Sequence, residues 1–304
     1  MGHIMKWDIF LAKKIMNIFN KYISYRTASK FENWHNLFSE NNNFIIHRLS
    51  NGTILKLYKD SILSKLIYEG FENKELLFID KFLKPGDTFF DIGSNIGLHS
   101  IFASAKLKSN GRIYAFEPSI KTFNRLNENV LLNNLNSTIQ TFQIGISNKN
   151  ETLILNVSED GHDAWNSFSK LLHINLTLKE EISVKRLDDF IFDNSIKPDT
   201  VTFIKIDVEG WELHVLSGLE KLIYSKDFNP IFLIEFTEEN AFRTGYSCRD
   251  IYLYLVSKGY RWYDYNEVDN EVYESPLKAY YPYENLIALK PEQLENLKKR
   301  LQAE

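Results

Sequence analysis

The middle of the chain alternates between two patterns of apolar residues. Short continuous apolar runs are typical of strands buried on both faces of a sheet, whereas apolar residues that recur every three or four positions indicate helices with one buried face. Their alternation predicts a Rossmann-like α/β fold, in which helices cover both faces of a mostly parallel sheet. Seven strands are predicted for this sheet, at residues 88–92, 112–116, 139–144, 201–206, 231–236, 260–265 and 285–289.

Helical spacing appears before the first of these strands and between most of the others. An insert at about residues 148–198 separates the third strand from the fourth, and it carries strand-like runs of its own at 152–157 and 182–187. The helices are predicted at residues 72–83, 97–107, 119–134, 211–225 and 247–258.

The first 70 residues follow a different pattern. Residues 5–25 have helical spacing with one apolar face, which packs on the same domain or binds a partner or a membrane surface. Residues 44–57 predict a β-hairpin, because Asn51-Gly52 supplies the positive φ that a tight turn requires. We therefore expect an N-terminal extension of helices and a hairpin at 1–70, an α/β domain at 71–290 and a C-terminal helix at 291–304.

Composition narrows the partners and the compartment. With a formal net charge of −4, the 304-residue chain lacks the basic excess of nucleic-acid-binding proteins. No segment has the roughly 18 uncharged apolar residues of a membrane span, and residues 5–25 do not form a secretory signal. The single cysteine, Cys248, excludes an intrachain disulfide, so we expect a cytoplasmic protein. Cys248 is interpreted as a small packed residue rather than a catalytic thiol, and homo-oligomerisation stays open.

The first candidate ligand site is the segment Asp91-Ile92-Gly93-Ser94-Asn95-Ile96-Gly97. Ligands of open α/β sheets bind where such a strand ends, and glycines let the backbone approach them closely. The amides at the start of the next helix would attract an anionic group. A dinucleotide fingerprint would need glycines where the chain has Asn95 and Leu98. The turn therefore suits a ligand without phosphate, such as S-adenosylmethionine, whose methionine end carries a carboxylate and an ammonium.

The second candidate is Glu117, which ends the next strand 24 residues after Gly93 (117 − 93). An acid at about this spacing binds ribose hydroxyls in nucleotide-binding sheets, and one carboxylate can accept from both hydroxyls. Pro118 then ends the strand.

The third candidate is a group of acids around the strand at 201–206. Asp207 ends this strand, and Glu209 and Glu212 are expected to share a face at the start of the following helix. Glu235 ends the next strand. Because the carboxyl ends of parallel strands meet at one edge, these acids are predicted to line the ligand site.

These segments together resemble the FkbM-type methyltransferase family, from about Phe71 to Leu289. The most specific part is the run from Ile204 to Glu212, Ile-Lys-Ile-Asp-Val-Glu-Gly-Trp-Glu. The glycine turn, the triplet Phe116-Glu117-Pro118 and the run Leu187-Asp188-Asp189 are also similar to the family's pattern. The resemblance implies a class I methyltransferase domain at 71–290 that uses S-adenosylmethionine.

The resemblance also implies roles for individual residues. Glu72, after Phe71, looks like an acid that the family places near the cofactor. The implied reaction is an in-line displacement at the sulfonium methyl, so the enzyme positions the reactants and accepts one proton. The expected cofactor-binding residues are Glu72, Asp91, Gly93, Ser94, Asn95, Gly97, Glu117, Pro118 and Asp207. The candidate bases are Asp207, Glu209, Glu235 and His162; His214 is more consistent with a packed helix residue.

The acceptor that we expect is a hydroxyl oxygen of a sugar, a glycan or a natural product, which would place the enzyme in glycan biosynthesis. Methylation of an amide nitrogen in a peptide is the alternative within the same class. A non-catalytic cofactor-binding or scaffold protein and a nicotinamide-dependent oxidoreductase are the alternatives outside it. Asp207, Glu235 and Asn240 carry oxygen ligands for a divalent cation. The family's pattern does not require a metal, and none is predicted.

Overall fold

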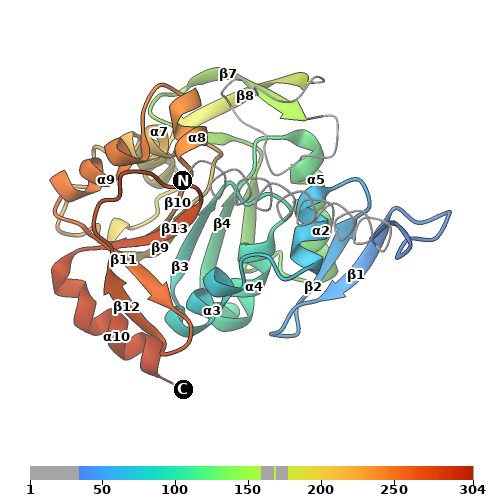
Figure 1. The fold of residues 1–304 in the computed structure, drawn as a ribbon, viewed down its shortest axis with the longest axis horizontal. Helices are drawn as coiled ribbons and strands as arrows, with labels where there is room; N and C mark the ends of the chain where they lie inside the picture. The colour runs from blue at the N-terminus through green and yellow to red at the C-terminus, as the bar shows by residue number, and fades with distance from the viewer. Residues whose placement is uncertain (1–33, 159–167, 169–176, 304) are drawn as a thin grey trace, which may run out of the picture.

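The computed structural model describes residues 34–158, 168 and 177–303 of the chain (Figure 1). The predicted helix at 5–25 and the candidate base His162 lie outside the described residues.

The central sheet has eight strands in the order β12-β11-β13-β10-β9-β3-β4-β5. Five of them run parallel: β3 (Thr88–Ile92), β4 (Arg112–Phe116), β5 (Ile139–Phe142), β9 (Val201–Ile206) and β10 (Ile231–Phe236). The other three pair antiparallel: β13 (Glu284–Leu289), β11 (Arg261–Asn266) and β12 (Glu271–Glu274). The α/β fold with a mostly parallel sheet is therefore confirmed.

The expected strand count was wrong by one, because β12 adds an eighth strand. Its sequence, Glu-Val-Tyr-Glu, has only two apolar residues between two acids, and only Val272 is buried. Such a segment has no apolar run of its own. It forms a strand because it pairs with β11 at the edge of the sheet.

Helices pack on both faces of the sheet, because successive strand residues point to opposite sides. Phe89 belongs to the core on one side, together with α3 (Asn73–Phe82), α4 (Leu98–Leu107), α5 (Ile120–Leu132) and α10 (Leu294–Gln302). Phe90 belongs to the core on the other side, together with α6 (Leu187–Asp193), α7 (Glu212–Ser217), α8 (Glu238–Arg243) and α9 (Cys248–Ser257).

Two expectations about this second layer can now be assessed. The helix expected at 211–225 is shorter, because α7 ends at Ser217. A Cβ on the next residue, Gly218, would come within 2.2 Å of the Ser147 carbonyl oxygen, so the chain passes too close there for any side chain. Cys248 is fully buried in the core, and this burial raises the pKa of its thiol, as expected of a packed residue rather than a nucleophile.

The N-terminal part of the described chain contains a hairpin of β1 (Phe44–Arg48) and β2 (Ile54–Tyr58), followed by α2 (Ile62–Tyr68). Side-chain amides of α5 bind this hairpin: Asn129 accepts from the Lys56 amide at 2.6 Å, and Asn133 accepts from the Ile54 amide at 3.0 Å. Leu55 and Leu57 enter the same core as α3 and α4. Placing a domain boundary at residue 70 stays a prediction.

The insert forms a separate three-stranded sheet of β6 (Gly145–Ser147), β8 (Thr177–Arg186) and β7 (Glu151–Ser158). It appears at the top of Figure 1, next to α7 and α8. Trp211, which precedes α7, donates from its indole nitrogen to the Ser147 hydroxyl at 3.1 Å and ties the two sheets together. None of the helices formed by the described residues has the length and apolar character that a bilayer span needs.

Candidate active site

The glycine turn closes the first parallel strand and passes directly against the end of β9. Gly93 has a φ of +81°, and a Cβ at this residue would lie 1.8 Å from the Asp207 carbonyl oxygen. Only glycine fits this approach, because both the backbone conformation and the space exclude a side chain. Gly97 precedes α4 with a φ of +94°. The turn therefore brings α4 and the Asp207 segment together at one edge of the sheet.

The amides of this turn hydrogen-bond within the protein. Those of Gly93 and Ser94 both donate to the Phe116 carbonyl oxygen, at 3.0 and 2.9 Å. The Asn95 amide donates to Glu117 Oε2 at 3.1 Å. The amides of residues 96 and 97 donate to Asn95 Oδ1 and to the Ser94 carbonyl oxygen. These bonds fix the conformation of the turn, and the expected role of the amides at the start of α4 stays a prediction.

Two backbone amides, one from the glycine turn and one from the segment before α5, hold the Glu117 carboxylate in place. Its Oε2 accepts from Asn95, and its Oε1 accepts from the Ser119 amide at 3.0 Å. Glu117 is only 5% exposed, and each carboxylate oxygen can accept more than one hydrogen bond. Pro118 links this carboxylate to the residues before α5. A rigid acid at the end of β4 is suited to binding hydroxyls.

Two serine hydroxyls near Glu117 lack hydrogen-bond partners among the described residues. Ser94 Oγ and Ser119 Oγ are both buried and unpartnered. An unsatisfied buried polar atom costs about 1–3 kcal/mol, so native proteins rarely leave one without a partner. A polar ligand at this edge would supply those partners.

A buried polar row crosses the sheet below the turn. Asp91 on β3 lies opposite Lys205 on β9, and both are almost fully buried. Lys205 Nζ lies 2.9 Å from Asp207 Oδ2, while Asp91 Oδ2 accepts from the Ser100 hydroxyl at 2.6 Å. Burial alone would lower the pKa of Lys205, but the carboxylates of Asp207, Glu72 and Asp91 outweigh it and raise that pKa. Lys205 is therefore a buried positive charge that fixes Asp207.

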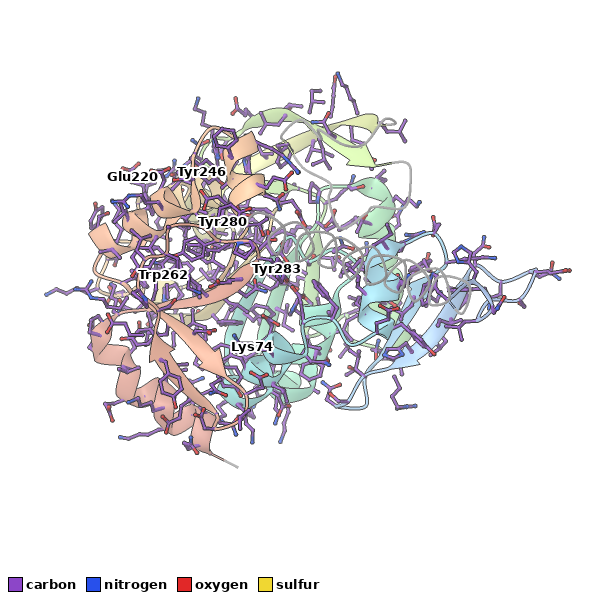
Figure 2. The ribbon with its side chains drawn as sticks, in the orientation of Figure 1. Lys74, Glu220, Tyr246, Trp262, Tyr280 and Tyr283 are labelled. Atoms are coloured by element: carbon purple, nitrogen blue, oxygen red, sulfur yellow. The ribbon has the colours of Figure 1, made fainter. Side chains whose placement is uncertain are left out.

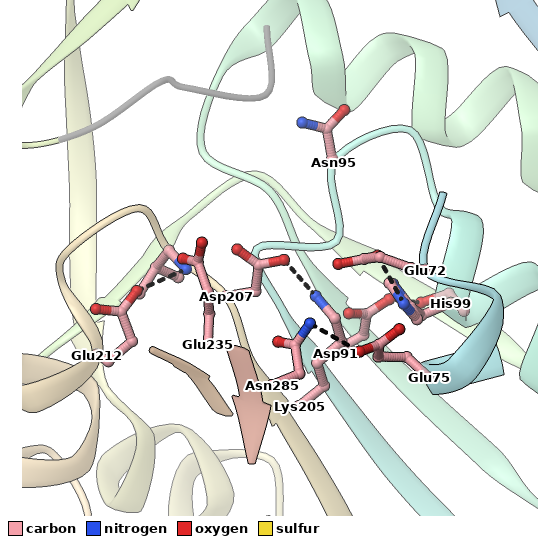
Figure 3. Close-up of polar contacts among 12 residues, drawn as sticks. Glu72, Glu75, Asp91, Asn95, His99, Lys205, Asp207, Glu212, Glu235 and Asn285 are labelled. Carbon is pink, nitrogen blue, oxygen red and sulfur yellow. Dashed lines mark hydrogen bonds and ion pairs between the residues drawn. The ribbon is translucent and has the colours of Figure 1, made fainter. Parts of the chain in front are cut away.

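Glu72 stands at the end of this row, in a left-handed conformation with a φ of +57°. Its Oε2 lies 3.0 Å from His99 Nε2, within ion-pair distance, although the two atoms are not aligned as a hydrogen bond. Its Oε1 accepts from the Tyr283 hydroxyl at 3.0 Å. Burial opposes ionisation, but His99, Lys205 and Tyr283 outweigh it and lower the pKa of Glu72 to about 2. Figure 3 shows Glu72 and His99 on one side of the site.

The opposite side of the site collects acids. Asp207, Glu209 and Glu235 each offer a carboxylate oxygen, and these oxygens all lie within 4.8 Å of one another. Glu209 accepts from Asn240 Nδ2 at 2.7 Å, and Glu235 accepts from the Thr237 hydroxyl at 2.8 Å. Burial raises the pKa of both glutamates well above the usual value, and the neighbouring carboxylates raise it further. We call these three residues the acid cluster.

Glu212 does not share a face with Glu209, which corrects the sequence expectation. Glu209 and Gly210 have φ values of +52° and +94°, so the chain is not helical until Glu212. Glu212 Oε1 instead accepts from the amides of Val208 and Gly210, at 3.2 and 3.0 Å. Burial raises the pKa of Glu212 to about 7 even though these amides oppose the shift. Glu212 shapes the turn that carries Glu209.

His214 is packed, as the sequence suggested. Its ring stacks on Trp211 with a centroid distance of 3.9 Å and an angle of 10°. Burial lowers its pKa.

Several residues of this site were not anticipated from the sequence. Lys205, His99 and Tyr283 complete the row at Glu72. Asn285 donates to Glu75 Oε1 at 3.1 Å beside them. Tyr283 is labelled at the centre of Figure 2, well away from Glu220 on the outer surface. Lys205 was the one of these residues that the sequence could have singled out, because a lysine inside a buried apolar strand needs a charged partner.

The chain was compared with known proteins. The model of the methyltransferase FkbM domain matches residues 91–262, more than half of the chain. Methyltransferase 1 of Beauveria bassiana is 32% identical over 171 residues, which are 49% of this chain and 67% of that protein. The hexuronic acid methyltransferase AglP of Haloferax volcanii is 30% identical over 145 residues, 47% of this chain and 54% of that protein. The 31-O-demethyl-FK506 methyltransferase FkbM of Streptomyces tacrolimicus is 30% identical over 165 residues, 45% of this chain and 61% of that protein. The matched region therefore spans between about half and two thirds of each relative.

Proposed function

Because the chain belongs to the family of methyltransferases with an FkbM domain, we propose that it methylates a hydroxyl oxygen of a sugar, a glycan or a natural product. Two relatives support this acceptor class, one described as a hexuronic acid methyltransferase and one as acting on an O-demethylated natural product. S-adenosylmethionine, which the sequence predicts as the cofactor, is confirmed by the family assignment.

The residues at the sheet edge fit this cofactor. Unpartnered hydroxyls of Ser94 and Ser119 flank Glu117, where ribose hydroxyls would bind. Asp207 lies across the turn from them and would face the positive charge of the ammonium or the sulfonium. The single observation that carries the proposal is this meeting of Glu117, the glycine turn and Asp207, which come from three different strands.

The acid cluster supplies the remaining requirement, a group that accepts the proton of the acceptor hydroxyl. A carboxylate with a raised pKa is a stronger base than an ordinary one when it is ionised, and Glu209 and Glu235 both have raised pKa values. The cofactor supplies the methyl group, while the protein orients the acceptor and removes its proton. We assign the base to the Glu209–Glu235 pair.

The first test is calorimetric titration with S-adenosylhomocysteine, with NAD titrated in parallel. We expect saturable binding of S-adenosylhomocysteine and none of NAD. Binding of NAD alone would support an oxidoreductase and would contradict the proposal.

The second test asks whether Glu117 binds the cofactor. Glu117→Ala is expected to raise the Kd for S-adenosylhomocysteine by about tenfold or more, as for the loss of hydrogen bonds to a charged group. Glu220→Ala, on the exposed surface, is the matched control and should leave the Kd unchanged. An unchanged Kd in a folded Glu117→Ala protein would contradict the ribose role.

The third test identifies the acceptor class by transfer of a labelled methyl group, beginning with hexuronic acids and other sugars. The expected product is a methyl ether of a carbohydrate or natural-product hydroxyl. A product methylated only on a peptide amide would overturn the acceptor assignment while leaving the cofactor assignment intact. The cytoplasmic location stays a prediction that rests on the cysteine count.

A further inference from the structure

The acid cluster gathers three carboxylates at one edge of the central sheet. Asp207 and Glu235 end neighbouring parallel strands, and the turn at Glu209 folds a third carboxylate towards them. Lys205 pairs with Asp207 at 2.9 Å. Arg243 pairs with Glu239 at 2.8 Å, and its charge also lowers the pKa of Glu209.

The two carboxylate oxygens of Glu235 differ in their hydrogen bonding. The residue is only 4% exposed, and its Oε1 accepts from Thr237. Its Oε2 is buried and has no hydrogen-bond partner among the described residues. A buried carboxylate oxygen in this position requires a partner that the surrounding side chains do not provide.

We infer that Asp207, Glu209 and Glu235 bind a divalent cation of the Mg²⁺, Mn²⁺ or Ca²⁺ type. Carboxylate oxygens are the ligands that these hard cations prefer. Two oxygens on one ion lie at most twice the bond length apart, which is about 4.2 Å for Mg²⁺ and about 4.6–5.2 Å for Ca²⁺. The observed limit of 4.8 Å lies within the span for a pair of oxygens on Ca²⁺, whereas Mg²⁺ or Mn²⁺ would draw the three oxygens closer together.

The ligand set differs from the alternative that the sequence offered, in which Asn240 was a ligand. Asn240 Nδ2 donates to Glu209 Oε2 at 2.7 Å, so this amide orients a ligand. Such outer hydrogen bonds fix the orientation of a carboxylate that binds a metal. Glu209 takes the place of Asn240 in the site.

The consequence for catalysis rests on the proposed function. A cation in the acid cluster would bind the acceptor hydroxyl oxygen beside the cofactor and lower the pKa of that hydroxyl. Metal binding itself does not depend on the proposed function and is measured without cofactor or acceptor.

The test is titration of the full-length protein with Mn²⁺, followed by electron paramagnetic resonance, because bound Mn²⁺ loses the sharp signal of the free ion. We expect saturable binding to the wild type and competition by Mg²⁺ and Ca²⁺. Glu235→Gln and Glu209→Gln should each weaken binding at least about tenfold. Glu220→Gln removes a carboxylate from the exposed surface and should change nothing.

Absence of saturable binding to the wild type would overturn the inference. The carboxylates of the acid cluster would then be neutralised by protons instead of a cation. Equal weakening in Glu220→Gln and Glu235→Gln would also overturn it, because the ion would then be bound non-specifically. Circular dichroism verifies that each variant is folded, and Asp207→Asn replaces any glutamine variant that is not. Binding of S-adenosylhomocysteine without Mn²⁺ binding would refute the cation site and leave the proposed function standing.

Discussion

The two sides of the candidate site bury glutamates to a similar degree, yet they change the acidity of these glutamates in opposite directions. On the β3 side, His99, Lys205 and Tyr283 surround Glu72 and lower its pKa to about 2, against the effect of burial. On the β10 side, burial raises the pKa of Glu235, and carboxylates surround it and raise the pKa further. The neighbours, rather than burial, decide whether a buried carboxylate is charged.

The two sides of the site therefore differ in how they can respond to a ligand. The charges around Glu72 compensate one another, so that side forms a fixed framework. The acid cluster contains repulsion that a proton or a cation must relieve, so that side can respond to a ligand. The predictions below test the contrast, beginning with the largest expected effect.

The contact between the two sides depends on Gly93. Gly93→Ala should destabilise the protein by at least about 4 kcal/mol, because its Cβ would clash with the Asp207 carbonyl oxygen while φ is positive. Gly86→Ala is the matched control: φ is +94° there, but no atom lies within 4 Å of the new Cβ, so only about 1–2 kcal/mol is expected. Urea unfolding measures both, and equal losses would show that the close approach is unimportant.

Removing the charge that supports the framework should have the next largest effect. Lys205→Met leaves Asp207 without its partner and should cost about 3–5 kcal/mol of unfolding free energy. Lys205→Met combined with Asp207→Asn should recover part of this loss, because the uncompensated carboxylate is gone. Additive losses in this double-mutant cycle would contradict the pairing.

The two sides should differ in how stability depends on pH. Ionised Glu72 stabilises the fold above its unfolded pKa of 4.5, by up to about 3 kcal/mol, and this contribution is lost as pH falls from 4.5 towards 2. Glu72→Gln should therefore lower stability at neutral pH and flatten the acid limb of the profile. Urea unfolding over a pH series checks this, and an unchanged acid limb would exclude the role of Glu72.

Glu235 should show the reverse behaviour. Its folded pKa lies above the unfolded value of 4.5, so the unfolded chain releases the proton first. With a chelator present, stability should fall by up to about 1.4 kcal/mol per pH unit as pH rises from 4.5 towards the folded pKa. Glu235→Gln should reduce this decrease, and Glu209 and Glu212, whose pKa values are also raised, account for the remainder. An unchanged decrease in the variant would exclude Glu235 as a contributor.

The smallest effect is expected for one neutral hydrogen-bond donor of the framework. Tyr283→Phe removes the hydroxyl that donates to Glu72 Oε1 and should cost about 1 kcal/mol of unfolding free energy. Tyr280→Phe, at an exposed position, is the control. A loss as large as that of Glu72→Gln would mean that Tyr283 has a further role.

Local sequence patterns predicted most of the strands, because a strand buried on both faces is a continuous apolar run wherever it stands. The same logic found Asp91, Glu117, Asp207 and Glu235, since each acid lies within or directly after such a run. The prediction that Glu212 shares a helix face with Glu209 was wrong, because Glu209 and Gly210 have positive φ values and the helix begins only after them. Gly210 was the one residue in this segment whose type favours a positive φ.

The framework around Glu72 could not be predicted from local patterns. Besides Asp207, Lys205 is neutralised by Glu72 and Asp91, which lie more than 100 residues earlier in the sequence (205 − 91 = 114). His99 belongs to a helix whose apolar pattern explained it without reference to the site, and Tyr283 lies outside the predicted elements. Their roles follow from tertiary neighbours, which an isolated sequence does not reveal.

The pairing of β3 with β9 also sets the order in which the molecule can assemble. Phe89 pairs with Phe203, so the two central strands meet only after about 114 residues of intervening chain have been synthesised (203 − 89). Contacts of such long sequence separation form late and slow the folding of a domain. On the ribosome, the glycine turn therefore lacks its partner at Asp207 until most of the chain has emerged. The nascent protein exposes the apolar edge of β3 during that interval, when it is most prone to aggregate or to need a chaperone.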